Sequence, residues 1–202
     1  MLNQVLGAVK NSTQSTGGTA DTITKVGGGA AVAGILSMIL GRNGGSNLAK
    51  LGSLAALGSL AYKAYQNYQQ NNGQAQNLPA ENFEEANVSQ EAGVIILRTM
   101  IAAAACDGEI DEQEYATIAK EAQQSPELEQ WLHQEIQQPI STAEIAQTVG
   151  HNPALAAQVY LAARLVCGAD LSRKEIVFLA QLSTALNLDD SLVEQLEKQA
   201  GF

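Results

Sequence analysis

The stretch Ile95–Tyr115, IILRTMIAAAACDGEIDEQEY, decides the fold. From Ile96 to Ala104, its apolar residues recur at steps of three and four, the spacing of a helix with a broad buried face. Asp107-Gly108 then ends the run, because glycine readily takes the left-handed conformation that commonly terminates helices. Asp111 and Glu114 follow at the spacing of a capping pair. The stretch therefore predicts a helix, an acidic turn and a second helix.

A second stretch sixty-one residues downstream has the same order. Ala162–Ile176, AARLVCGADLSRKEI, aligns Cys167 with Cys106 and Glu175 with Glu114. Its Ser172 forms a regular S-x-x-E capping box with Glu175. Two copies cannot make a solenoid. We therefore predict a duplicated helical unit that folds back on itself around one core.

Helix-start signals mark the rest of the second half of the chain. Ser125-Pro126 and Asn152-Pro153 each place a capping residue before a proline at the first helical position. Ser141 and Glu144 form another capping box, and Asp189 opens the last helix. These signals predict about seven helices between Ser89 and Gln199 and no strand. The fold class is all-α.

The charge of the chain is unevenly distributed. The formal net charge is −10, yet residues 1–75 carry five basic side chains against Asp21 alone, and the remainder carries 6 basic and 20 acidic ones. The two parts thus have charges of +4 and −14 and are expected to face different surroundings. Because phosphates require a basic surface, the acidic part argues against nucleic acid as a partner.

Two apolar segments lie in the basic part. Val26–Leu40 has no charged residue, and Leu48–Tyr65 is interrupted only by lysines. Each is shorter than the ~20 apolar residues that cross a bilayer easily. Both nevertheless carry small-xxx-small spacings, which let helices approach closely within membranes and would support a homo-oligomer. Membrane association with lipid contact is the preferred interpretation, as a single span, a hairpin or an interfacial anchor. A soluble helical hairpin or a flexible tail is the alternative.

The distribution of lysine and arginine predicts the orientation of these segments. Arg42, Lys50 and Lys63 follow the first apolar segment closely, so the positive-inside rule places the carboxyl-terminal side in the cytoplasm. Gln66–Asn77 holds nine Asn or Gln in twelve residues and predicts a linker. The predicted organisation is a membrane-associating region at 1–65, a linker at 66–87 and a helical domain at 88–202.

The acidic turn is a candidate metal site. Asp107, Glu109 and Asp111 occupy the first, third and fifth positions of an EF-hand-like loop, but Glu112 and Ile118 replace its glycine and its bidentate glutamate. An oxygen-only set formed with Glu114 would suit Ca²⁺ or Mg²⁺. In the simpler interpretation these acidic residues cap the following helix, and their negative charge interacts favourably with the positive end of its dipole.

Other chemistry has little support. His133 and His151 lack the spacing of a zinc site and are expected at the surface, while Trp131 is expected in the core. The sequence contains no phosphate-binding glycine motif and no nucleophile elbow, so an enzyme is not predicted. The two cysteines are expected to be free and buried, although one bridge between the equivalent helix ends is conceivable.

Three features together resemble a known family. The Gly-rich amino-terminal region, the run LGSLAALGSLAYKAYQNYQ (Leu51–Gln69) and DGEIDEQE (Asp107–Glu114) resemble the YebE-like family of uncharacterised bacterial proteins. The carboxyl-terminal domain of that family belongs to the TerB-like, tellurite-resistance-associated helical group. The resemblance implies an all-helical bundle with internal pseudo-symmetry, attached to an inner-membrane segment, without known catalysis and associated with envelope stress.

The resemblance also bears on the metal site. It implies metal binding at the acidic turn, where the matching positions are Asp107, Glu109, Asp111 and Glu114. In the second copy Gly168 replaces the first acid. The expected function is a non-enzymatic membrane-associated adaptor or stress protein that binds a protein partner. The alternative is a divalent-cation-binding stress module.

Overall fold

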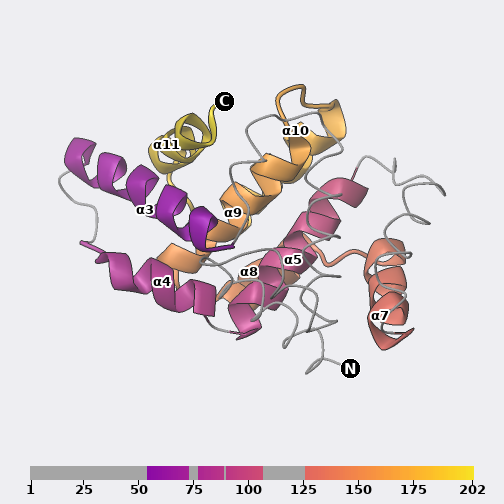
Figure 1. The fold of residues 1–202 in the computed structure, drawn as a ribbon. Coiled ribbons are helices and arrows are strands. Elements are labelled where there is room, and N and C mark those ends of the chain that lie inside the picture. Colours follow the sequence, from indigo (N-terminus) through magenta and orange to yellow (C-terminus); the bar gives the residue numbers. More distant parts are fainter. Residues whose placement is uncertain (1–53, 73–76, 89, 107–125) are drawn as a thin grey trace, which may run out of the picture.

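The computed structural model describes residues 54–72, 77–88, 90–106 and 126–202, which form eight α-helices and no strand. The prediction of an all-α fold is confirmed for these residues. Figure 1 shows the helices, which are α3 (Leu54–Asn71), α4 (Ala80–Val88), α5 (Gln90–Ala105), α7 (Pro126–Gln137), α8 (Thr142–Val149), α9 (Pro153–Cys167), α10 (Arg173–Ala185) and α11 (Asp190–Ala200). The helix predicted to begin at Asp111 lies outside the described residues.

Helix α9 is the axis of the structure. All of its residues from Ala154 to Cys167 are buried, and α3, α4, α5, α8, α10 and α11 all pack against it. A helix that is apolar nearly all round is stable only when other elements cover it on every side. Its five alanines let those neighbours approach closely. Asn152 caps its start and Gly168, at a φ of 74°, ends it.

Helix α5 is the second central element, and it packs directly on α9. Its Ile95, Ile96 and Ile101 are at most 2% exposed. The two related stretches of the sequence therefore meet in one core, as expected of a duplicated unit. The acidic turn and the second helix of the first copy lie outside the described residues, so the duplication itself stays a prediction.

The predicted helix starts are confirmed where the structure describes them. The Asn152 side chain accepts a hydrogen bond from the Leu155 amide at 3.0 Å. Ser141 and Ser172 each form a complete capping box, with Glu144 and Glu175 respectively. Asp189 caps α11. These local signals work because the capping side chain satisfies amides of its own first turn, whatever the surroundings.

The structure differs from the predicted linker at 66–87. Gln66–Asn71 forms the end of α3, and Ala80–Val88 forms α4. Phe83 of α4 is 1% exposed, and its ring lies 5.5 Å from that of Tyr62 and 5.7 Å from that of Tyr65. Composition misled the prediction, because one buried aromatic per helix can anchor an otherwise polar segment to a core.

The second predicted membrane segment also has a different place. Its described part, Leu54–Tyr65, belongs to α3, whose Leu57, Ala61, Ala64 and Tyr65 are buried where α4, α9 and α11 pack on it. The helical domain therefore begins well before residue 88, inside the region assigned to the membrane. Among the described residues, none of the helices combines the length and apolar character of a membrane span. Val26–Leu40 lies outside them.

Candidate functional site

The predicted metal ligands Asp107, Glu109, Asp111 and Glu114 lie outside the described residues. Within the described ranges, no group of three or more His, Cys, Asp or Glu side chains is placed to hold a metal ion. Asp170 and Glu175 of the second copy are described, and Glu175 caps α10 as part of its capping box. The cation site therefore stays a prediction about the first copy alone.

This prediction has a direct test in the full-length chain. Millimolar Ca²⁺ or Mg²⁺ is expected to raise the melting temperature, because a ligand that binds only the folded state stabilises it. The double substitution Asp107→Asn and Asp111→Asn should abolish the rise, whereas Asp189→Asn, in a helix cap elsewhere, should leave it unchanged. A melting temperature that does not respond to either cation would exclude the site.

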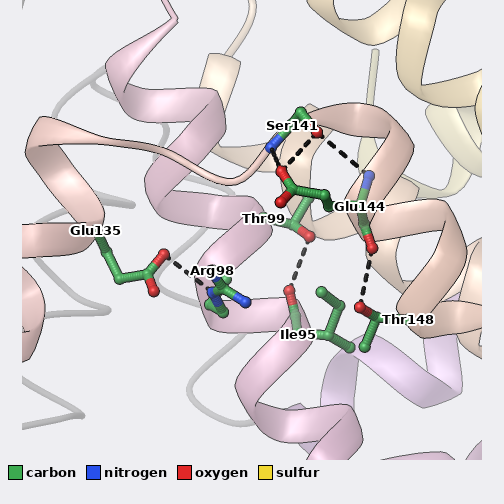
Figure 2. Close-up of polar contacts among 7 residues, drawn as sticks. All are labelled: Ile95, Arg98, Thr99, Glu135, Ser141, Glu144 and Thr148. Carbon is green, nitrogen blue, oxygen red and sulfur yellow. Dashed lines mark hydrogen bonds and ion pairs between the residues drawn. The ribbon is translucent and has the colours of Figure 1, made fainter.

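A group of polar side chains lies where α7 and α8 pack on α5 (Figure 2), and its Arg98–Glu135 pair joins α5 to α7. The Arg98 Nε donates to Glu135 Oε2 at 2.9 Å, and the two side chains are 33% and 11% exposed. Next to Arg98 on α5, the buried Thr99 hydroxyl donates to the Ile95 carbonyl of its own helix. Such an ion pair satisfies a carboxylate that would otherwise be costly to bury. Arg98 thus links α7 to α5.

Glu144 lies in the first turn of α8 and forms a capping box with Ser141. Its Oε2 accepts hydrogen bonds from the Ser141 hydroxyl at 2.7 Å and the Ser141 amide at 3.0 Å. These bonds hold the pKa of the Glu144 carboxyl below its ordinary value, and the positive charge of Arg98 acts in the same direction. The carboxylate is therefore committed to the helix cap.

The capping box predicts a pH-dependent contribution to stability. A lowered folded-state pKa means that the Glu144 carboxylate stabilises the fold above its unfolded-state pKa of about 4.3, and that this contribution is lost as pH falls through the lowered value. Ser141→Ala should lower the melting temperature by a few degrees at pH 7 and by progressively less below pH ~4. Ser183→Ala is the control, since that hydroxyl donates to a backbone carbonyl. A deficit for Ser141→Ala that is the same at both pH values would contradict the assignment.

A second polar cluster joins α9 to α11. Glu197 Oε1 accepts from the Tyr160 hydroxyl at 2.9 Å and from the Arg164 Nε at 3.2 Å. Arg164 is almost fully buried, donates through Nη1 to the Gly168 carbonyl, and lies with its Cζ 3.7 Å from the centre of the Phe202 ring. Burial, followed by the neighbouring Glu197 carboxylate, raises the pKa of Tyr160, so its phenol stays protonated as the donor.

Two further side chains form hydrogen bonds between segments far apart in the sequence. Gln158 on α9 is fully buried and donates to the Phe83 carbonyl of α4 at 3.1 Å, while its Oε1 has no partner among the described residues. The side-chain amide of Asn72 donates to the Ser191 hydroxyl at 3.4 Å, so the residue after α3 lies next to the start of α11. The buried Gln158 bond thus links α9 to α4, and the exposed Asn72–Ser191 bond lies where α3 ends and α11 begins.

The remaining candidates lie where the sequence placed them, or close to it. His133 and His151 are exposed, and Trp131 is buried at 8% exposure, as predicted. Cys106 and Cys167 are not joined by a disulfide bond; Cys167 is buried and Cys106 is half-buried. The Arg164 cluster was missed by the sequence analysis. Its only signal was one arginine within the apolar run of α9.

Comparison with known protein families identifies the family to which the chain belongs. The family model described as "Protein of unknown function (DUF533)" matches residues 25–200, which is most of the chain. The chain belongs to this family. No curated protein and no solved structure matches it significantly. The DUF533 match includes α3, α4 and the carboxyl-terminal helices in a single unit, in agreement with their common core.

Proposed function

We propose that this DUF533 chain is a non-enzymatic adaptor, held at the bacterial inner membrane by its amino-terminal region, which presents a TerB-like helical domain with internal pseudo-duplication to the cytoplasm. The observation that carries the proposal is the outward surface of α10. Ile176 and Val177 are 52% and 50% exposed there, whereas the Arg98–Glu135 and Tyr160–Glu197 hydrogen bonds are made between helices of the chain itself. Exposed apolar side chains gathered on one helix are typical of surfaces that bind proteins.

The position of the apolar segments supports an anchor upstream of the domain. Since α3 packs into the helical core, the second apolar segment contributes to the domain and Val26–Leu40 is the remaining candidate anchor. The charge of −14 over residues 76–202 disfavours contact between the domain and anionic lipid, so the domain would extend away from the membrane surface. A role in stress responses is part of the proposal and rests on the TerB-like resemblance.

Membrane fractionation of the unchanged chain and of two deletion variants tests the anchor. The unchanged chain is expected to stay in the membrane pellet through washes with high salt and with alkaline carbonate. Deletion of residues 26–40 should release it, whereas deletion of the polar residues 11–24, of almost the same length, should not. Recovery of the unchanged chain in the carbonate supernatant would overturn the integral anchor. Equal retention of both deletion variants would show that residues 26–40 are not responsible.

A further inference from the structure

Phe83 connects α4 to two other helices. Its ring lies 5.5 Å from the ring of Tyr62 and 5.7 Å from that of Tyr65, both on α3. Its main-chain carbonyl accepts a hydrogen bond from Gln158 Nε2 of α9 at 3.1 Å. Among the α4 side chains that the structure describes, at residues 80–84, only that of Phe83 is buried. One residue thus contacts two of the three helices, α3, α5 and α9, on which α4 packs (Figure 1).

Gln158 is a costly residue at this place in the core. Its side chain is fully buried, and Oε1 has no hydrogen-bond partner among the described residues. Turning the amide over does not help, because Oε1 would then face the Phe83 carbonyl oxygen. A buried acceptor without a partner has lost its hydrogen bonds to water and lowers the stability of the fold. A methionine, which is apolar and of similar length, would fill this place without that cost. Stability alone therefore does not account for a glutamine here.

The side chains next to Gln158 on α9 are apolar. One turn away on the same face lie Ala154, Leu155, Leu161 and Ala162, all of them buried. The free energy of apolar contact depends on the area covered and only weakly on direction, so such a surface accepts a neighbouring helix in several orientations. The ring of Phe83 would by itself fix the place of α4 and leave it free to turn about that point.

We propose that Gln158 sets the direction of the α4 axis, and that the fold gives up some stability for this single orientation. The carbonyl groups of a helix point along its axis, so a hydrogen bond to one of them restrains the direction of the axis. If α4 turned about the Phe83 ring, Nε2 would lose the carbonyl and become a second buried group without a partner. Other orientations are therefore penalised more than the native one, in the way that single buried polar residues specify the register of coiled coils.

The hydrogen bond restrains α4 whatever side chains its outer face carries, because the acceptor belongs to the main chain. Glu81 and Glu84 of α4 are exposed. In the native orientation these carboxylates are held on the surface of the domain, although neither contributes to the contact with Gln158.

Fluorine NMR of the full-length chain tests whether Gln158 determines this orientation. The chain has only three phenylalanines, Phe83, Phe178 and Phe202, so incorporation of fluorophenylalanine gives three signals, and Phe83→Leu identifies that of Phe83. The Phe83 signal of the unchanged chain should be one sharp line. Gln158→Met should split or broaden it, because α4 then takes more than one orientation, while the signals of Phe178 and Phe202 serve as internal controls.

The melting temperature distinguishes a positioning role from a stabilising one. Gln158→Met should leave it unchanged or raise it by up to about 5 °C, because the substitution removes the acceptor that has no partner. Gln147→Met is the matched control, since Gln147 is exposed on α8; it should change neither the melting temperature nor the Phe83 signal.

Two results would overturn the proposal. If Gln158→Met melts below Gln147→Met, or no longer folds, Gln158 contributes to stability and its Oε1 has a partner in solution, such as a buried water molecule. If the Phe83 signal of Gln158→Met stays a single sharp line, the aromatic contacts with α3 are sufficient to orient α4. Neither measurement depends on residues 26–40 or on the outward surface of α10, so the proposed adaptor function stands or fails separately.

Discussion

Replacing Phe83 with alanine is expected to lower the free energy of unfolding by about 3–5 kcal/mol, the usual cost of removing a fully buried phenylalanine. The ring is 1% exposed and contacts the rings of Tyr62 and Tyr65 on α3. Its loss leaves a cavity between α3 and α4, next to the buried Gln158 on α9. Chemical denaturation of the full-length protein, with and without the substitution, measures the difference.

The same experiment distinguishes a core helix from a linker. Glu84→Ala changes the next residue of α4, which is exposed, and should alter stability by less than about 0.5 kcal/mol. Phe83→Leu should fall between the two, because it keeps part of the buried volume. If Phe83→Ala were as mild as Glu84→Ala, α4 would not be part of the core, and the predicted linker at 66–87 would be restored.

The second large loss of stability is expected when the pair formed by Arg164 and Glu197 is broken. The cost should differ according to which of the two residues is replaced. The Arg164 side chain is 5% exposed and that of Glu197 is 33% exposed. Among the described residues, Glu197→Ala leaves the buried guanidinium with the Gly168 carbonyl and the Phe202 ring, which should cost about 3 kcal/mol. Arg164→Met leaves a carboxylate that water reaches and that Tyr160 still contacts, so its cost should be about 1–2 kcal/mol.

A double-mutant cycle checks the asymmetry. The double variant Arg164→Met with Glu197→Ala should be more stable than Glu197→Ala alone, because it no longer buries an unpaired charge. Lys198→Ala is the control on the same helix; it removes an exposed i,i+4 pair with Glu194, and such pairs contribute little. Equal costs for Arg164→Met and Glu197→Ala would show that burial of the arginine does not determine the energetics of this cluster.

Much of the local structure could be predicted because its causes are local. Asn152-Pro153 and the two serine–glutamate boxes begin helices through contacts within one turn. Periodicity likewise predicted the broad buried face of α5. The candidate metal site rests on sequence alone, since Asp107–Glu114 lies outside the described residues.

The errors arose where distant contacts decide the outcome. The aromatic residues of α3 and Phe83 come from segments that look apolar and polar respectively, yet they pack together. The average composition of a polar segment does not reveal that one of its aromatic rings is buried. The apolar character of Leu54–Tyr65 is equally compatible with lipid or with a protein core, because both offer a medium without water. Packing by α9 and α11 distinguishes the two environments for α3.

By itself, the sequence determined the all-α class, most helix starts, the caps and the division of charge, because these depend on residues within a few positions of one another. Only the tertiary structure decided that α3 and α4 belong to the domain and that Arg164 is neutralised by Glu197 from a helix 33 residues away. It also decided which apolar residues of α10 stay outside the core. The physical reason is that burial and charge pairing depend on which surfaces the completed fold brings together.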